Sequence, residues 1–108
     1  MIYITSQFTL GMLEQHHNSY DLLVDRIPKE EALAYIKAAE CRIQWVELCH
    51  AIADDLNIPQ TLEPSPIPIK LSDGDIMIVA HYRGPRINPG FRHAGTFTYY
   101  RMEVAKND

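Results

Sequence analysis

Residues 82–93 bring together side chain types that could bind a phosphorylated ligand. Guanidinium groups hold phosphate oxygens through paired hydrogen bonds, aromatic rings stack on nucleobases, and a carboxamide pairs with a base or ribose edge. No Walker or Rossmann glycine fingerprint is present. We therefore predict an anion or nucleotide site with phosphate partners Arg83, Arg86 and Arg92, a stacking ring from Tyr82 or Phe91, and base or ribose recognition by Asn88. The alternative is that this segment is only a connecting loop, in which prolines and glycines interrupt regular secondary structure.

The charge of the chain is unevenly distributed around this segment. The 108 residues include 10 Lys and Arg against 14 Asp and Glu, a net charge of −4. Between Ile76 and Met102 there are four arginines and no acidic residue, so this window carries +4 and the rest of the chain −4 − 4 = −8. Extended binding to duplex nucleic acid needs many phosphate contacts, which an acidic chain disfavours. A small phosphorylated ligand needs only a few cationic donors.

The composition, with 46% apolar and 22% charged residues, is that of a globular domain. No apolar run is long enough to span a membrane and the N-terminus lacks the pattern of a secretory signal, so we expect a cytoplasmic protein. Cys41 and Cys49 lie eight positions apart in one predicted helix, a rise of about 12 Å, too far for a disulfide. We expect free thiols, as in a reducing compartment. No metal-binding motif is present, and no metal or cofactor is predicted.

Two helices are predicted in the first half of the chain. Pro28 suits a first helical turn and is followed by glutamates that complement the helix dipole, which predicts a helix over about 28–39. A second helix is predicted over about 41–56 from one apolar stripe at helical spacing, formed by Trp45, Cys49, Ile52 and Leu56. This stripe places Trp45 in the core. His50 falls off the stripe, at the border of the core.

The remaining patterns predict strands. Apolar alternation and β-branched or aromatic content indicate strands at about residues 2–8, 20–25 and 96–104. Asp73-Gly74 is a tight-turn signal and predicts a hairpin between 67–71 and 76–82. We therefore predict an α+β fold in one domain over 1–108, with about five strands in a mixed or antiparallel sheet and two helices packed on one face.

Three stretches, Ile2–Leu13, Ile67–Val79 and Arg83–Gly90, carry a resemblance to known viral proteins. They resemble the type III anti-CRISPR ring nucleases, which bind and cleave cyclic tetra-adenylate. They are also similar to the anti-Thoeris sponge proteins of phages, compact oligomers that sequester cyclic ADP-ribose isomers, and in some members cyclic trinucleotides, without cleaving them. Both families act on a cyclic nucleotide signal of host immunity, and the resemblance implies this class of ligand.

The catalytic features of the ring nucleases are not matched. Those enzymes use a Gly-His pair at the start of the second long helix, where the histidine protonates the 5′ oxygen that leaves. An ungapped reading puts Gln44-Trp45 at this place, and indole cannot supply that proton. The nuclease loop resembles Arg-Leu-x-Glu-Gly, whereas Arg86–Gly90 keeps the arginine and loses the glutamate. The resemblance therefore implies a protein that sequesters a cyclic nucleotide without cleaving it.

Two other functions stay open from the sequence. One is a metal-independent ring nuclease with His50 as general acid and Arg86 stabilising the transition state, which requires a gap in the alignment. The other is a protein-interaction module whose aromatic C-terminal strand forms an oligomer interface. Because enclosing a nucleotide takes more concave surface than about 100 residues readily spare, we expect a homo-oligomer, at least a dimer. The expected location is the cytoplasm of the infected bacterial host.

Overall fold

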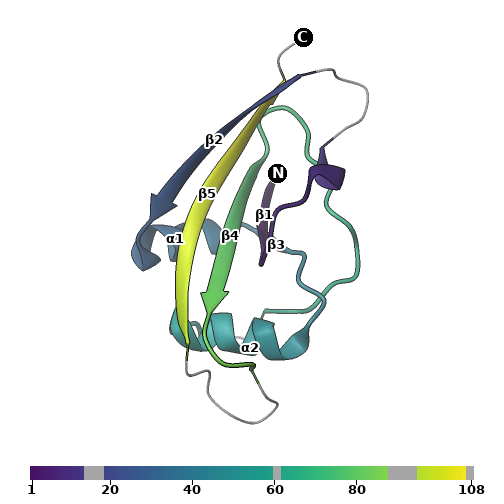
Figure 1. The fold of residues 1–108 in the computed structure, drawn as a ribbon. Coiled ribbons are helices and arrows are strands. Elements are labelled where there is room, and N and C mark those ends of the chain that lie inside the picture. Colours follow the sequence, from purple (N-terminus) through teal and green to yellow (C-terminus); the bar gives the residue numbers. More distant parts are fainter. Residues whose placement is uncertain (14–18, 60–61, 88–94, 107–108) are drawn as a thin grey trace.

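A computed structural model of the protein describes residues 1–13, 19–59, 62–87 and 95–106. Five strands form one sheet in the order β2-β5-β4-β1-β3 (Figure 1). In chain order the elements are β1 (Ile2–Thr5), the 3-10 helix η1 (Leu10–Met12), β2 (Tyr20–Ile27), α1 (Lys29–Ile36), β3 (Glu40–Cys41), α2 (Val46–Asp55), β4 (Ile76–Arg83) and β5 (Thr96–Lys106). The predicted α+β fold with a five-stranded mixed sheet and two helices is confirmed.

The sheet has an antiparallel half and a parallel half. β5 lies between β2 and β4 and pairs antiparallel with both, from Tyr20↔Lys106 to Ile27↔Tyr99 on one side and from Ile76↔Glu103 to Arg83↔Thr96 on the other. β1 pairs in parallel with β4 and with the two-residue strand β3. The pairing of β3 is extended by the backbone amide of Arg42, which donates to the carbonyl of Ile4 at 2.9 Å.

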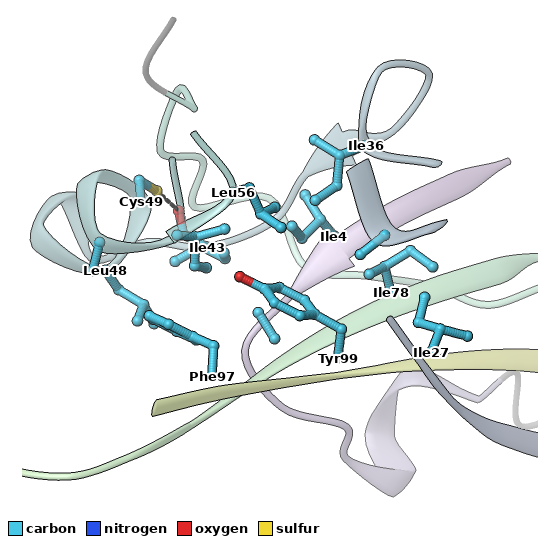
Figure 2. Packing of buried hydrophobic residues seen from close by; sticks show 14 of the residues in the cluster. Ile4, Ile27, Ile36, Ile43, Leu48, Cys49, Leu56, Ile78, Phe97 and Tyr99 are labelled. Atoms are coloured by element: carbon cyan, nitrogen blue, oxygen red, sulfur yellow. Dashed lines mark hydrogen bonds between the residues drawn. The ribbon is translucent and has the colours of Figure 1, made fainter. Parts of the chain in front are cut away.

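Each face of the sheet carries its own apolar cluster. Because side chains alternate along a strand, neighbouring residues of β1 and β4 enter different clusters. Both helices pack on one face, where Ala32 and Ile36 of α1 and Leu48 and Ile52 of α2 join sheet residues in one cluster. Figure 2 shows this cluster gathered around Tyr99 and Ile78, including Ile4, Ile27 and Phe97. The opposite face is covered without an α-helix, by chain segments that bring Ile69, Leu71, Phe8 and Met12 against Tyr3, Met77, Val79, Met102 and Val104.

The second helix begins five residues later than predicted. Residues 40 and 41 pair with β1 as β3, so the chain turns before α2 begins at Val46. Trp45 is the residue that caps α2, and 41% of it is exposed, so the prediction that it lies in the core is wrong. The predicted separation of the cysteines is also wrong. Since Cys41 is in β3 and only Cys49 is in α2, their sulfurs lie 4.0 Å apart.

The predicted hairpin between 67–71 and 76–82 is wrong. The turn at Asp73-Gly74 is present, with Gly74 at φ 85° and the amide of Asp75 donating to Ser72 at 3.0 Å. However, both edges of β4 are paired, with β1 and with β5, which leaves no edge for the preceding segment. That segment contains Pro68, which lacks the amide donor of a central strand, and its last residue, Leu71, bridges to Leu13 instead.

The other predicted boundaries differ by a few residues. The first strand ends at Thr5, and Phe8 lies beyond it, partly buried on the face opposite the two α-helices. The first helix ends at Ile36, three residues early, because the amides of Ala38 and Ala39 bond three residues back and tighten into a turn. The second and last predicted strands each continue two residues further, as β2 and β5.

Candidate functional site

Tyr82, one of the two predicted stacking rings, is partly buried against the helix-covered core. Its ring lies 5.1 Å from that of Phe97, and its hydroxyl donates to the carbonyl of Pro85 at 2.5 Å. Gly95 packs so closely on the same ring that a Cβ there would come within 2.5 Å of it, and Gly84 lies against Gly95. Gly84 and Gly95 therefore let two parts of the chain approach each other closely, because neither residue has a side chain.

Two of the three predicted phosphate partners, Arg83 and Arg86, lie in the described part of the chain. Arg83 ends β4, and both it and Arg86 are exposed. Asn88, Phe91 and Arg92 lie outside the described residues. Arg101 is the fourth arginine of the basic window. Its guanidinium donates to the Tyr35 hydroxyl and to Glu103, and it lies over the Tyr35 ring. His50, the alternative general acid, is exposed on α2.

A different cavity, which we call the β1 pocket, lies where β1 ends. Its volume is about 560 Å³, within the range of small-molecule sites. The wall comes from three segments: the chain leaving β1, the chain leaving β3 into α2, and residues 67–70. Its polar and aromatic lining includes Thr5, Ser6, Gln7, Arg42, Gln44, Trp45 and Lys70.

The topology accounts for the position of this pocket. β1, β3 and β4 are parallel, so their carboxyl ends meet at one edge of the sheet, where α/β folds commonly bind ligands. The chain leaving β3 reaches the start of α2 at the same edge. Among the described residues no side chain caps the N-terminus of α2, so amides of its first turn are available to a ligand or to water. Helix polarity adds a partial positive charge here.

Arg42 is the best-positioned cation of the pocket. Its guanidinium lies 5.5 Å from the centre of the Tyr3 ring and donates to the carbonyl of Cys41 at 3.0 Å. One terminal nitrogen pairs with Glu40, which offsets part of its charge. The Nε atom is buried and has no hydrogen-bond partner in the described structure. These contacts hold Arg42 in place before any ligand arrives.

Lys70 and Trp45 complete a charge and ring pattern suited to a nucleotide. Lys70 is exposed and supplies a second cation, and Trp45 presents an indole that is 41% exposed. None of the described lining residues is Asp, Glu or His. The pocket can therefore attract an anion and stack an aromatic group.

The sequence prediction missed these residues for a specific reason. A helix over 41–56 assigns Arg42 to its first turn and Trp45 to its buried stripe, so neither is a binding candidate. The signal for a later start is Glu47, an acidic residue in the first turn of α2, where it complements the helix dipole. Thr5, Ser6 and Lys70 carry no local signal, because only the tertiary fold brings their segments together.

Two features relevant to other functions can be reported for the described residues. No cluster of three or more His, Cys, Asp or Glu is placed to hold a metal ion there. No helix in the described part of the chain is long and apolar enough to cross a membrane.

Comparison with known proteins gives a likeness of fold. No protein-family model matches the chain and no curated protein matches it either. Among solved structures, B116 of Sulfolobus turreted icosahedral virus is similar, with a TM-score of 0.76. The alignment covers 94% of this chain and 97% of the viral protein at 12% sequence identity. The two proteins therefore share a fold over nearly their whole lengths.

Proposed function

We propose that this protein binds and sequesters a cyclic nucleotide messenger, a cyclic ADP-ribose isomer or a cyclic oligonucleotide, without cleaving it. The observation that carries the proposal is the lining of the β1 pocket, where Arg42, Lys70 and Trp45 face one hollow that has no acidic residue among its described lining. Cations bind the phosphates of such a ligand and the indole stacks on its base. The protein would thus act as an anti-defence factor in the cytoplasm of an infected bacterial host.

The family resemblance supports the same pocket. Two of the three stretches that carry it, Ile2–Leu13 and Ile67–Val79, contribute wall residues to the β1 pocket. The place at which the ring nucleases have their catalytic histidine is Trp45, which also lines the pocket. An indole there favours stacking on the ligand and removes the general acid, which supports retention over cleavage.

Exposed apolar side chains support a homo-oligomer. Leu10 and Ile67 are 77% and 58% exposed, and Val46 follows Trp45 at the start of α2. Ile67 and Trp45 line the β1 pocket, and Leu10 and Val46 are chain neighbours of lining residues. A second copy that packs on this face would bury these side chains and enclose a ligand larger than one pocket. Sedimentation analysis with and without ligand tests this part of the proposal.

The experiment that tests the function is incubation with cyclic tetra-adenylate, cyclic trinucleotides and cyclic ADP-ribose isomers. The protein is separated from free ligand and then heat-denatured, and the released material is identified by chromatography. Recovery of one intact cyclic nucleotide supports sequestration and names the ligand. Linear products would show a ring nuclease and direct attention to His50, and no retained nucleotide would favour an interaction module.

We further propose, from the sequence, that Arg86 contributes a phosphate contact from outside the β1 pocket. Arg86→Ala should then weaken binding of a phosphorylated ligand by about 1.5–3 kcal/mol, the range of a charge-assisted hydrogen bond. Isothermal titration measures this loss. Arg26→Ala, which removes an exposed cation from β2 at the far edge of the sheet, is the matched control. Unchanged affinity in Arg86→Ala would remove this residue from the site and leave the β1 pocket as the binding region.

A further inference from the structure

The two cysteines meet although they belong to different elements. Cys41 ends β3, and Cys49 lies one turn into α2, where its amide donates to the carbonyl of Trp45. Their sulfurs are 4.0 Å apart and both thiols are free. A disulfide bond is about 2.05 Å long, so the sulfurs need to approach by about 2 Å. Side-chain rotation at the half-buried Cys41 can supply a movement of this size.

The two thiols differ in access and in acidity. Cys49 is completely buried, and its sulfur points to the carbonyl of Ile43 at 3.9 Å (Figure 2). Cys41 is partly exposed. The hydrogen bond between the two thiols, together with the Ile43 backbone and the charge of Arg42, lowers the pKa of Cys41 to about 7. The same hydrogen bond and burial raise the pKa of Cys49. One thiol is therefore reactive, and the other is shielded from reagents but adjacent to it.

We propose that Cys41 and Cys49 form a redox-active dithiol that is oxidised to an intramolecular disulfide by a small-molecule disulfide such as oxidised glutathione. The Cys41 thiolate attacks one glutathione sulfur, a mixed disulfide forms, and a glutathione thiolate leaves. Cys49 then attacks the Cys41 sulfur, expelling a second glutathione thiolate that takes up the Cys49 proton. The protein loses two electrons and two protons, and oxidised glutathione is reduced to two glutathione molecules.

Disulfide formation between Cys41 and Cys49 is chemically distinct from ligand binding, although the cysteine pair lies next to the β1 pocket. The segment that a Cys41–Cys49 bond would close contains Arg42 and Trp45, two residues of the pocket wall. Closing such a loop restricts the unfolded chain more than the native one when native geometry fits the bond. The equilibrium between the two thiols and the disulfide should therefore lie further toward the disulfide in the native protein than in the denatured chain.

The order of attack can be tested with single-cysteine variants of the full chain in native buffer. After incubation with oxidised glutathione, intact-mass analysis of Cys49→Ser should show one stable glutathione adduct on Cys41. Cys41→Ser should react at least about tenfold more slowly, because its remaining thiol is buried. The wild type should lose two hydrogens and carry no adduct. Equal reaction rates in the two variants, or a wild type that retains the adduct, would overturn the proposal.

A second measurement does not depend on how the variants fold. The equilibrium constant for the wild-type disulfide against a glutathione redox buffer is measured in native buffer and in concentrated urea. We expect it to be about 10- to 100-fold larger in the native protein, since the nearby sulfurs favour closure there. The Cys41→Ser/Cys49→Ser double variant has neither thiol, so its mass should stay unchanged and serves as the control. An equal or smaller constant in the native protein would show that the fold opposes the bond.

Discussion

β2 and β4 pair with β5 over eight residues each, whereas β1 pairs with β4 over four residues and with β3 over two. The long antiparallel half carries Phe97 and Tyr99, two large rings of the helix-covered core. The short parallel half ends early, and the chain leaving β1 and β3 forms most of the wall of the β1 pocket. Under the proposed function, the antiparallel half stabilises the fold and the parallel half binds the ligand, and variants can separate these two roles.

The largest effect is expected in the antiparallel half. Phe97 is buried between Tyr82 and Tyr99, with ring centroids 5.1 and 6.1 Å away. Phe97→Ala should lower the free energy of unfolding by about 3–5 kcal/mol, the cost of truncating a buried aromatic. Urea denaturation measures the loss, with Thr96→Ala as an exposed control on the same strand. A loss below about 1 kcal/mol would contradict the assignment of stability to this half.

Arg42→Ala tests the parallel half. It should weaken binding of the retained cyclic nucleotide by about 1.5–3 kcal/mol, or roughly 10- to 150-fold, because a charge-assisted phosphate contact is lost. Isothermal titration gives the affinity, and Arg26→Ala controls for the change in net charge. If both variants bind alike, Arg42 is not a ligand contact and the β1 pocket is not the phosphate site.

Trp45→Ala should separate binding from stability most clearly. Because the side chain is 41% exposed, the free energy of unfolding should fall by less than about 2 kcal/mol, below the cost of a buried aromatic. Binding should weaken by about 1–3 kcal/mol, the contribution of one stacked base. Trp45→Phe keeps a ring and should retain most of the affinity. A fall in stability of about 3–5 kcal/mol would instead place Trp45 in the core, as the helical spacing predicted.

The smallest effect concerns a polar contact of the antiparallel half. The Tyr99 hydroxyl donates to Asp55 at 2.7 Å, and Lys29 pairs with the same carboxylate at 3.0 Å. Tyr99→Phe should cost about 1–2 kcal/mol at neutral pH, because Asp55 keeps its lysine but loses one donor. Urea denaturation measures this difference.

The same residue gives a prediction for alkaline pH. Burial, followed by the contact with Asp55, raises the pKa of Tyr99 above the ordinary tyrosine value of about 10. Its contribution is fully present below that pH and is lost above it, because the unfolded state releases the proton first. The urea midpoint of the wild type should therefore fall more steeply than that of Tyr99→Phe as pH rises above about 10. Parallel declines would exclude Tyr99 as a source of this pH dependence. Tyr3, whose pKa burial also raises, contributes equally to both proteins.

The predictability of the fold follows the same division of the sheet. β2, β4 and β5 have local patterns of alternation and β-branched residues, and the sequence locates all three to within a few residues. β3 has no such pattern. Its two residues, Glu40 and Cys41, form a strand only because β1 lies beside them. Residues 67–71 have a local strand pattern, but β4 has no free edge for them. Parallel pairing between distant segments is decided by the tertiary fold, which local patterns do not encode.

The site was less predictable than the fold because its residues come from three separate segments. The clustered arginines of residues 83–92 form a strong local signal, whereas Arg42, Trp45 and Lys70 are isolated in the sequence. Placing Trp45 at the start of a helix, and not inside one, changes it from a core residue to a wall of the β1 pocket. Because the predicted helix begins five residues too early, the sequence prediction did not identify Arg42 and Trp45 as site residues.

The most direct test of the central claim uses Trp45, because it is the only tryptophan in the chain and it lines the β1 pocket. Its fluorescence is titrated with cyclic tetra-adenylate, cyclic trinucleotides and cyclic ADP-ribose isomers, and melting temperature is followed in parallel. We predict that one class changes the Trp45 emission saturably at the concentrations that raise the melting temperature. A cyclic nucleotide that stabilises the protein and leaves Trp45 emission unchanged would contradict binding in the β1 pocket.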